Sequence, residues 1–228
     1  MTSPGDLVLA DRVDVVRSGI VDAAREAGRS PDEITTIVVT KFHPESLVRE
    51  LHRLGVRDFG ENRHQEAAVK AQATRDLPLV WHFVGQLQGN KAKRVREYAQ
   101  VIHSVDRESL VDALMSETVA VDCFLQINLT EDAHRGGTAG DAVLRLAEKV
   151  LSTAGLNLLG VMAVAPLGED PRHAFSRVAA ISLRVQSVAP EAAFISAGMS
   201  ADYREAILEG ATHLRIGTAI TGKRPDAG

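Results

Sequence analysis

A lysine at the end of an apolar run is the first feature of this sequence that could carry chemistry. Lys41 directly follows the β-branched segment 35–40, which is typical of a buried strand. Two interpretations fit it: a side chain that carries its ammonium to the surface, or an amine that forms a Schiff base. Because an ordinary amine is almost fully protonated at neutral pH, the second interpretation requires apolar surroundings or a nearby positive charge. We expect residues 37–39 to supply the apolar surroundings and Arg215 the charge.

Glycines and hydroxyls gather in two segments near the end of the chain. These segments are SAGMS, residues 196–200, and RIGTAITG, residues 215–222. Glycine lets the backbone approach an anion closely, and hydroxyl and backbone N–H groups can then bind a phosphate. An equally good interpretation makes Gly217 and Gly222 simple turn glycines and Ser200 the N-cap of the helix predicted to follow it.

Other polar groups give weaker signals. His82 lies in an alternating strand segment, WHFV, where a histidine is more typical of the core or rim than of catalysis. A basic run follows and is predicted to be a solvated helix face; it comprises Lys91, Lys93, Arg94 and Arg96. The sequence has no HxH, HExxH or GxSxG motif, so it gives no support for a metal site or a serine nucleophile.

Composition excludes several classes of function. The net charge of -4 and a sequence pI near 6.1 give no general attraction to nucleic acid or anionic lipid. Cys123 is the only cysteine, which rules out an internal disulfide and fits a reducing, cytoplasmic location. The N-terminus has no basic segment before an apolar stretch, and no apolar run is long enough to span a membrane, so neither a signal peptide nor a membrane helix is predicted.

The elements that must position these groups alternate regularly along the chain. An amphipathic helix is predicted from Asp6 to near Ala27, and about eight apolar runs follow, each with a helical segment after it. This count is typical of an α/β fold, a single (β/α)8 TIM barrel, and it favours that barrel over a doubly wound open sheet. We expect one domain over residues 1–228, with the helix of residues 1–30 packed on the barrel. Chemistry in such a barrel sits at the C-terminal ends of the strands.

Several segments, in order, resemble one known family. They are VVTKFHP, FGENRHQE, WHFVGQLQGNK, HSVDR, LQINLTEDAHRGG, GVMAVAP and SAGMSADYREAILEGATHLRIGTAITG. Together they cover nearly the whole chain and resemble the YggS/PROSC family of pyridoxal 5'-phosphate (PLP) homeostasis proteins. The fold of that family is similar to the barrel domain of alanine racemase, PLP fold type III.

The resemblance implies PLP as the cofactor and assigns residues to it. Lys41 would form the Schiff base with PLP, and Asn62 would lie beside the ring. Ser200, Gly217 and Thr218 would hold the phosphate. No metal is implied.

The resemblance also implies that Arg215 faces the pyridine nitrogen and that His82 and Met199 line the pocket. A guanidinium cannot accept a proton, so the ring would remain a weak electron sink. Racemisation would also need a second acid or base opposite the lysine. Alanine racemase takes that group from an additional domain, and the tyrosines of this chain, Tyr98 and Tyr203, are not predicted to lie at strand ends.

We therefore expect a PLP carrier or buffer in vitamin B6 homeostasis, with no efficient turnover and no catalytic residue. An amino-acid racemase and a Schiff-base enzyme acting on a sugar phosphate are the alternatives. Expected partners are PLP, free amino acids and apo forms of PLP enzymes, with the chain as a monomer. Departures from the usual family pattern put the packing of the pocket in question; they are Arg63, His64, Ala197 and Thr221.

Overall fold

Short runs rich in Val, Ile, Leu and Phe form eight parallel strands in the computed structural model, which describes residues 4–132 and 135–222. The strands are β1 (Thr35–Val39), β2 (Asp58–Glu61), β3 (Val80–Phe83), β4 (Val101–Val105), β5 (Val121–Gln126), β6 (Leu156–Met162), β7 (Phe194–Ser196) and β8 (His213–Ile216). Each strand pairs with its neighbours in chain order, and β8 pairs with β1, so the sheet closes into a barrel. The predicted (β/α)8 architecture is confirmed.

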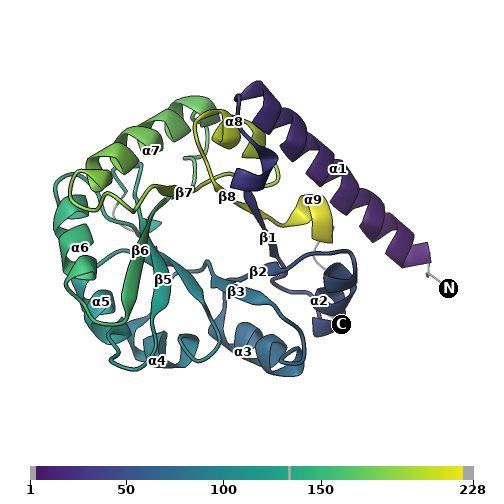
Figure 1. Cartoon of the computed structure of the whole chain (residues 1–228), viewed down its shortest axis with the longest axis horizontal. Coiled ribbons are helices and arrows are strands. Elements are labelled where there is room, and N and C mark those ends of the chain that lie inside the picture. The colour runs from purple at the N-terminus through teal and green to yellow at the C-terminus, as the bar shows by residue number, and fades with distance from the viewer. Residues whose placement is uncertain (1–3, 133–134, 223–228) are drawn as a thin grey trace.

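Helices surround the barrel because their apolar stripes pack against the outer faces of the strands (Figure 1). They are α1 (Pro4–Glu26), α2 (Glu45–Arg53), α3 (His64–Ala73), α4 (Ala92–Val95), α5 (Glu108–Leu114), α6 (Ala142–Leu151), α7 (Pro171–Gln186), α8 (Tyr203–Leu208) and α9 (Thr218–Thr221), with the short 3-10 helices η1 (Pro31–Glu33) and η2 (Gly89–Lys91). In α6, for example, Val143, Leu146, Ala147 and Val150 are buried at helical spacing. Figure 1 shows these helices as an outer ring around the strands.

The first helix links the two ends of the chain. In α1 the buried residues recur every three or four positions; they are Leu9, Val13, Val16, Ile20, Ala23 and Ala24. This stripe packs against α8 and α9, the last helices of the described chain, as Figure 1 also shows. The barrel is thus closed twice, by the pairing of β1 with β8 and by α1 outside it.

Strand alternation divides the core into two parts. Trp81 and Phe83 of β3 face outward, into the main apolar core between sheet and helices. Val101, Phe124 and Met162 form a separate apolar cluster. Because the Phe124 ring contacts rings on both β4 and β8, which are not neighbours in the sheet, this cluster lies inside the barrel. The alternation predicted for WHFV is confirmed, because His82 lies on the opposite face from Trp81 and Phe83, with its ring centre 5.2 Å from that of His103.

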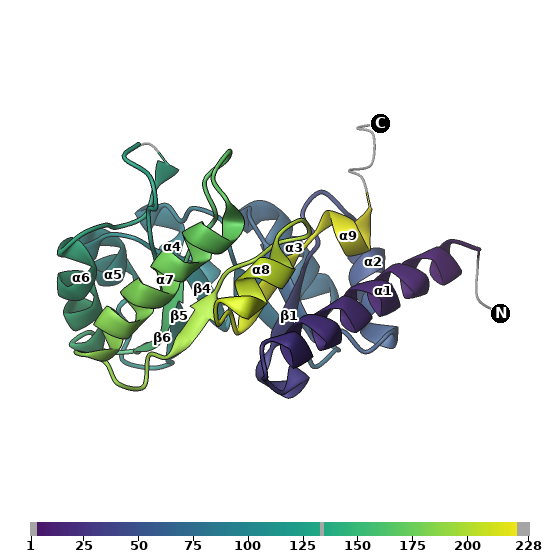
Figure 2. The same cartoon turned by 90° about the horizontal axis from the view of Figure 1, so that it is seen from above.

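Loops at the C-terminal ends of the strands project from one side of the molecule. Figure 2 shows the loop before α7 rising on the same side as α9, which follows β8. In a parallel barrel this is the face where functional groups converge. Among the described residues, none of the helices is both long and apolar enough to cross a membrane.

Candidate functional site

Lys41 lies in the turn that follows β1, at the C-terminal rim of the barrel. Val39, the last residue of β1, pairs with Gly60 of β2 and lies close to Gly217 after β8. Two residues further on, Lys41 therefore projects from the rim between the ends of β2 and β8. The strand ends before the lysine, which is exposed, with its Nζ 5.9 Å from the centre of the Phe42 ring.

The expectation that residues 37–39 would give Lys41 apolar surroundings is wrong. Val38 faces outward, into the core shared with α1, and also borders a pocket there. Ile37 and Val39 face the missing side chain of Gly60, where an added Cβ would lie 3.1 Å from each of them. The β-branched run therefore builds the strand and packs the barrel wall below the lysine.

Helix α3 holds the turn around Lys41 in place. The Nζ of Lys70 donates a hydrogen bond of 2.8 Å to the carbonyl of Thr40. The backbone N–H of Phe42 donates to the Glu66 carboxylate at 3.0 Å. Phe42 adopts φ of 69°, a left-handed conformation that is costly for a bulky residue and persists where its surroundings impose it. Contacts from α3 on both sides of Lys41 thus fix the direction in which its side chain leaves the backbone.

A buried ion pair supports these contacts between α3 and the Lys41 turn from outside the barrel. Lys70 Nζ lies 2.6 Å from Glu61 Oε1, which also accepts a hydrogen bond of 2.7 Å from the Thr40 hydroxyl. The two side chains are only 6% and 1% exposed, so removing either charge would leave the other uncompensated. Burial raises the pKa of Glu61, and the ammonium of Lys70 acts in the opposite direction.

Asn62 follows β2 and occupies a half-buried position beside the end of β3. Gly85, after β3, passes so close to it that a Cβ on Gly85 would overlap the Asn62 carbonyl. The absence of a side chain at Gly85 therefore sets the position of the Asn62 backbone.

A Gly85→Ala substitution is expected to displace this segment. We expect the free energy of unfolding to fall by about 1–3 kcal/mol, since backbone must move to admit the methyl group. Gly89→Ala is the matched control, because its Cβ would meet Ala113 at an ordinary 3.8 Å. Urea unfolding of both variants measures the difference, and equal losses would contradict the steric argument.

Ser200 joins the loop after β7 to the loop after β8. Its Oγ accepts hydrogen bonds from the backbone N–H groups of Gly217, at 3.3 Å, and Ala219, at 3.1 Å. The hydroxyl proton remains available to donate to an anion. The space beside Gly217 is open, since an added Cβ would meet nothing closer than 3.9 Å. Ser200, Gly217 and the exposed Thr218 are thus brought together at the rim.

The interpretation of Ser200 as the N-cap of the next helix is wrong. Helix α8 begins at Tyr203, and Asp202 occupies its N-cap position. The Asp202 carboxylate accepts a hydrogen bond of 2.6 Å from the backbone N–H of Met199. Met199 is 37% exposed on this loop. The loop is therefore closed by its own aspartate, which leaves Ser200 to bind the β8 side.

Arg215 extends from β8 into the barrel interior and is 6% exposed. Its guanidinium donates to the Ser196 hydroxyl at 2.6 Å and to the Ala163 carbonyl at 2.9 Å. Burial lowers the pKa of Arg215 to about 10, which still leaves it a cation at neutral pH. Because Ala163 directly follows β6, the guanidinium lies near the C-terminal mouth. Further N–H groups of this fork can reach an acceptor there.

His82 belongs to a buried hydrogen-bonded chain inside the barrel. Its Nε2 lies 3.0 Å from Asp58, and its Nδ1 lies 3.0 Å from His103 Nε2. His103 Nδ1 in turn lies 2.9 Å from the Ser196 hydroxyl that binds Arg215. Sequence reasoning missed Asp58, His103 and Ser196, since no short-range spacing connects them. Strand alternation was the available signal, because it turns alternate residues of every strand inward.

Protonation of interior histidines is expected to couple stability to pH. Burial lowers the pKa of His103 well below its ordinary value and that of His213 to about 4. The unfolded chain takes up these protons as pH falls below about 6.5, so unfolding becomes easier there. For His213 the loss is about 2 kcal/mol at about pH 5. Urea unfolding should show a weaker pH dependence in His213→Gln but not in the exposed control His173→Gln; equal slopes would contradict the assignment.

The basic run and the two tyrosines have structural contacts. Arg96 is half-buried and binds backbone carbonyls of Leu114, at 2.8 Å, and Gly155, at 3.1 Å, so a solvated face is the wrong description for it. Tyr98 stacks on His64 with ring centres 5.9 Å apart, and burial raises the pKa of its hydroxyl. Tyr203 packs against α1.

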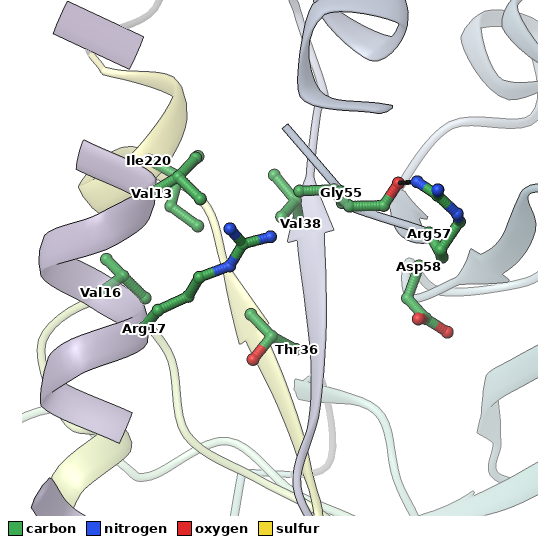
Figure 3. A pocket seen from close by; sticks show the side chains of 10 residues that line it. Val13, Val16, Arg17, Thr36, Val38, Gly55, Arg57, Asp58 and Ile220 are labelled. Atoms are coloured by element: carbon green, nitrogen blue, oxygen red, sulfur yellow. Dashed lines mark hydrogen bonds between the residues drawn. The ribbon is translucent and has the colours of Figure 1, made fainter. Parts of the chain in front are cut away.

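Two pockets lie at different places in the fold. One, of about 190 Å³, lies outside the barrel between α1 and β1, where Figure 3 shows Arg17 directed between Val13 and Thr36. Another, of about 210 Å³, borders the barrel mouth; it is lined by Asn62, Arg63, His64, Gln65, Phe83, Gln86, Leu87, Gln88 and Lys91. The second pocket therefore extends the rim beside Asn62. Its lining residues Arg63 and Lys91 supply positive charge.

Comparison with known proteins first identifies the class. The family model described as alanine racemase, N-terminal domain, matches residues 34–225. Alanine racemase from Corynebacterium glutamicum superposes with a TM-score of 0.66 at 15% identity, over 94% of this chain and 62% of that one. Such low identity shows a shared fold alone. The protein thus has the barrel that defines the alanine racemase N-terminal domain class.

Closer relatives identify the family. The pyridoxal phosphate homeostasis protein of Mycobacterium tuberculosis is 38% identical, over 95% of this chain and 93% of its own. That of Pseudomonas aeruginosa is 39% identical, over 95% and 96%. PipY of Synechococcus elongatus, solved with PLP bound, is 32% identical with a TM-score of 0.82, over 94% of this chain and all of that one. The chain belongs to the pyridoxal phosphate homeostasis protein family.

Proposed function

We propose that this protein binds PLP at the C-terminal mouth of its barrel and holds it on Lys41 as a carrier in PLP homeostasis. The observation that carries the proposal is the placement of an exposed lysine at a rim that also presents a phosphate-type cradle and a buried guanidinium. The family of the chain and the PLP bound in PipY support the same assignment.

The residues present fit the chemical groups of PLP. Ser200 keeps a hydroxyl proton to donate to a phosphate, next to the open side of Gly217 and the exposed Thr218. Arg215 is a buried cation whose hydrogen bonds go to a neutral hydroxyl and a neutral carbonyl, so an electron-rich ring would meet it favourably. Asn62 and Met199 stand on either side of this arrangement, on the loops after β2 and β7.

Each residue has a task that follows from its position. When bound, PLP supplies an aldehyde that condenses reversibly with an amine. Lys41 would provide that amine, with the turn around it fixed by α3. Arg215 cannot accept a proton, so it would keep a facing pyridine nitrogen unprotonated. That state weakens electron withdrawal and disfavours the carbanion chemistry of PLP enzymes.

The carrier role without efficient turnover is part of the proposal. A racemase needs a second acid or base opposite its lysine. In this chain Tyr98 is engaged with His64 and Tyr203 with α1, on the outer layer of the fold. The same reversible chemistry would let free amino acids or apo-enzymes withdraw PLP from Lys41.

An absorbance spectrum with and without borohydride, followed by peptide mass mapping, tests the proposal. We expect a yellow band after addition of PLP that bleaches on reduction and leaves a pyridoxyl group on the peptide containing Lys41. Mixing the loaded protein with amino acids should show exchange with negligible loss of the α-hydrogen. Absence of the band, or an adduct on another lysine, would refute the binding mode, and rapid loss of the α-hydrogen would refute the carrier role.

A further inference from the structure

Five side chains form an unbroken hydrogen-bonded chain through the barrel interior. The separations are 3.0 Å from Asp58 to His82, 3.0 Å from His82 to His103, 2.9 Å from His103 to Ser196 and 2.6 Å from Ser196 to Arg215. The residues come from β2, β3, β4, β7 and β8. Since β4 and β7 are not neighbours in the sheet, the bond from His103 to Ser196 crosses the interior. The interior of such barrels is usually filled by Val, Ile and Leu, so a series of polar side chains in this place needs a specific explanation.

The side chains at the two ends of this hydrogen-bonded series, Arg215 and Asp58, fix the direction in which its hydrogen bonds run. Arg215 can only donate hydrogen bonds, and an ionised Asp58 can only accept them. With both histidines neutral, only one arrangement makes all four bonds. Arg215 donates to Ser196, whose hydroxyl donates to Nδ1 of His103. Nε2–H of His103 then donates to Nδ1 of His82, and Nε2–H of His82 donates to Asp58.

Burial supports the arrangement in which both imidazole rings of this hydrogen-bonded series are neutral. His103 is fully buried and stacks on Phe124 with ring centres 4.7 Å apart, and its pKa is lowered well below the ordinary value. A protonated His82 would place a second cation in the interior that already holds Arg215. It would also reverse the bonds on both sides of His103, because His82 would then donate from both nitrogens. The Ser196 proton would lose its acceptor.

The hydrogen-bonded series of side chains connects the two opposite ends of the barrel. Asp58 begins β2, and its side chain is 28% exposed at the N-terminal rim. Arg215 reaches the carbonyl of Ala163, just beyond the C-terminal end of β6. The guanidinium is thus held by bonds to two different strands' ends, at Ser196 and Ala163. Only one of these two acceptors, Ser196, depends on the histidines.

We propose that Asp58, His82, His103 and Ser196 act as positioning residues that orient Arg215 toward the bound cofactor. Asp58 selects the Nε2–H tautomers of both histidines, and Ser196 consequently presents a lone pair to the guanidinium. The tautomer part stands on the hydrogen bonds alone, whereas the effect on PLP rests on the proposed function.

Nitrogen NMR of histidine-labelled protein without PLP tests the tautomers. We expect His82 and His103 each to carry a single ring proton, on Nε2. In Asp58→Ala, His103 should become a mixture of tautomers although Asp58 does not touch it. The control Asp122→Ala removes a carboxylate at the same rim that instead accepts a bond of 3.1 Å from Asn157. It should leave both spectra unchanged. A doubly protonated His82, or an Nδ1–H tautomer of His103, would overturn the proposal.

PLP titration of the same variants tests the positioning. We expect the Kd for PLP to rise about five- to tenfold in Asp58→Ala and to stay unchanged in Asp122→Ala. If Asp58→Ala does not fold, the isosteric Asp58→Asn should shift both readouts in the same direction. Expected tautomers with an unchanged Kd would refute the positioning role. A wild-type protein that does not bind PLP would instead refute the proposed function, while leaving the tautomer result valid.

Discussion

A Lys41→Ala variant is expected to give no yellow band with PLP and no borohydride-stable adduct. The reason is chemical: the amine that condenses with the aldehyde is gone, and the remaining contacts are noncovalent. Because Lys41 is exposed and lies in a turn, its truncation should leave the fold intact. Loss of the adduct would then report binding chemistry, with the thermal unfolding transition unchanged as the check.

Two lysines serve as comparisons for this result. Lys93 is exposed on α4, away from the ends of β1 and β8, so Lys93→Ala should retain the full adduct. Lys70 is the next lysine after Lys41 in the sequence, but its Nζ is already bonded to Glu61 and the Thr40 carbonyl. An adduct that persists in Lys41→Ala at the wild-type level would contradict the assignment. Mass mapping would then show which lysine carries it.

A Lys70→Met variant is expected to lose about 3–5 kcal/mol of unfolding free energy. Truncating one partner of a buried ion pair leaves the other charge without compensation, and here that is Glu61, 1% exposed. The variant also loses the hydrogen bond from Lys70 to the Thr40 carbonyl, which supports the Lys41 turn. PLP binding should therefore weaken together with stability.

Two further variants separate charge from packing. Lys149→Met removes the partner of the exposed Asp112, at 2.7 Å, and should cost no more than about 1 kcal/mol. Adding Glu61→Gln to Lys70→Met should restore part of the lost stability, because no charge then remains buried. Urea unfolding measures all three. A loss in Lys70→Met no larger than in Lys149→Met would show that the buried pair contributes nothing special.

Much of the fold could be predicted because local and global signals agree. The run of β1 is rich in β-branched residues, and helices follow the strands in regular alternation along the chain. The count of these units specifies a closed barrel, and closure places every strand end on one face. Position within a strand then indicates which residues can meet, as with Ser200 and Gly217, which follow β7 and β8 and are hydrogen-bonded at 3.3 Å.

What could not be predicted depends on details of packing between distant segments. Whether Ser200 caps α8 or binds the backbone of Gly217 depends on Asp202, which fills the cap position first. The surroundings of Lys41 depend on where β1 stops, and that is set by contacts from α3. The interior chain through His103 joins strands that share no local pattern. In each case a polar group could bind any of several partners, and sequence spacing does not indicate which partner it binds.

The double closure of the barrel has a consequence for synthesis of the protein. Lys41 is made early, whereas Arg215 and Gly217 are among the last described residues to leave the ribosome. Neither the pairing of β1 with β8 nor the packing of α1 on α9 can form before then. A nascent chain therefore exposes the lysine long before it can assemble the rest of the rim. The proposed binding of PLP at this mouth would therefore begin only after β8 and α9 have been synthesised.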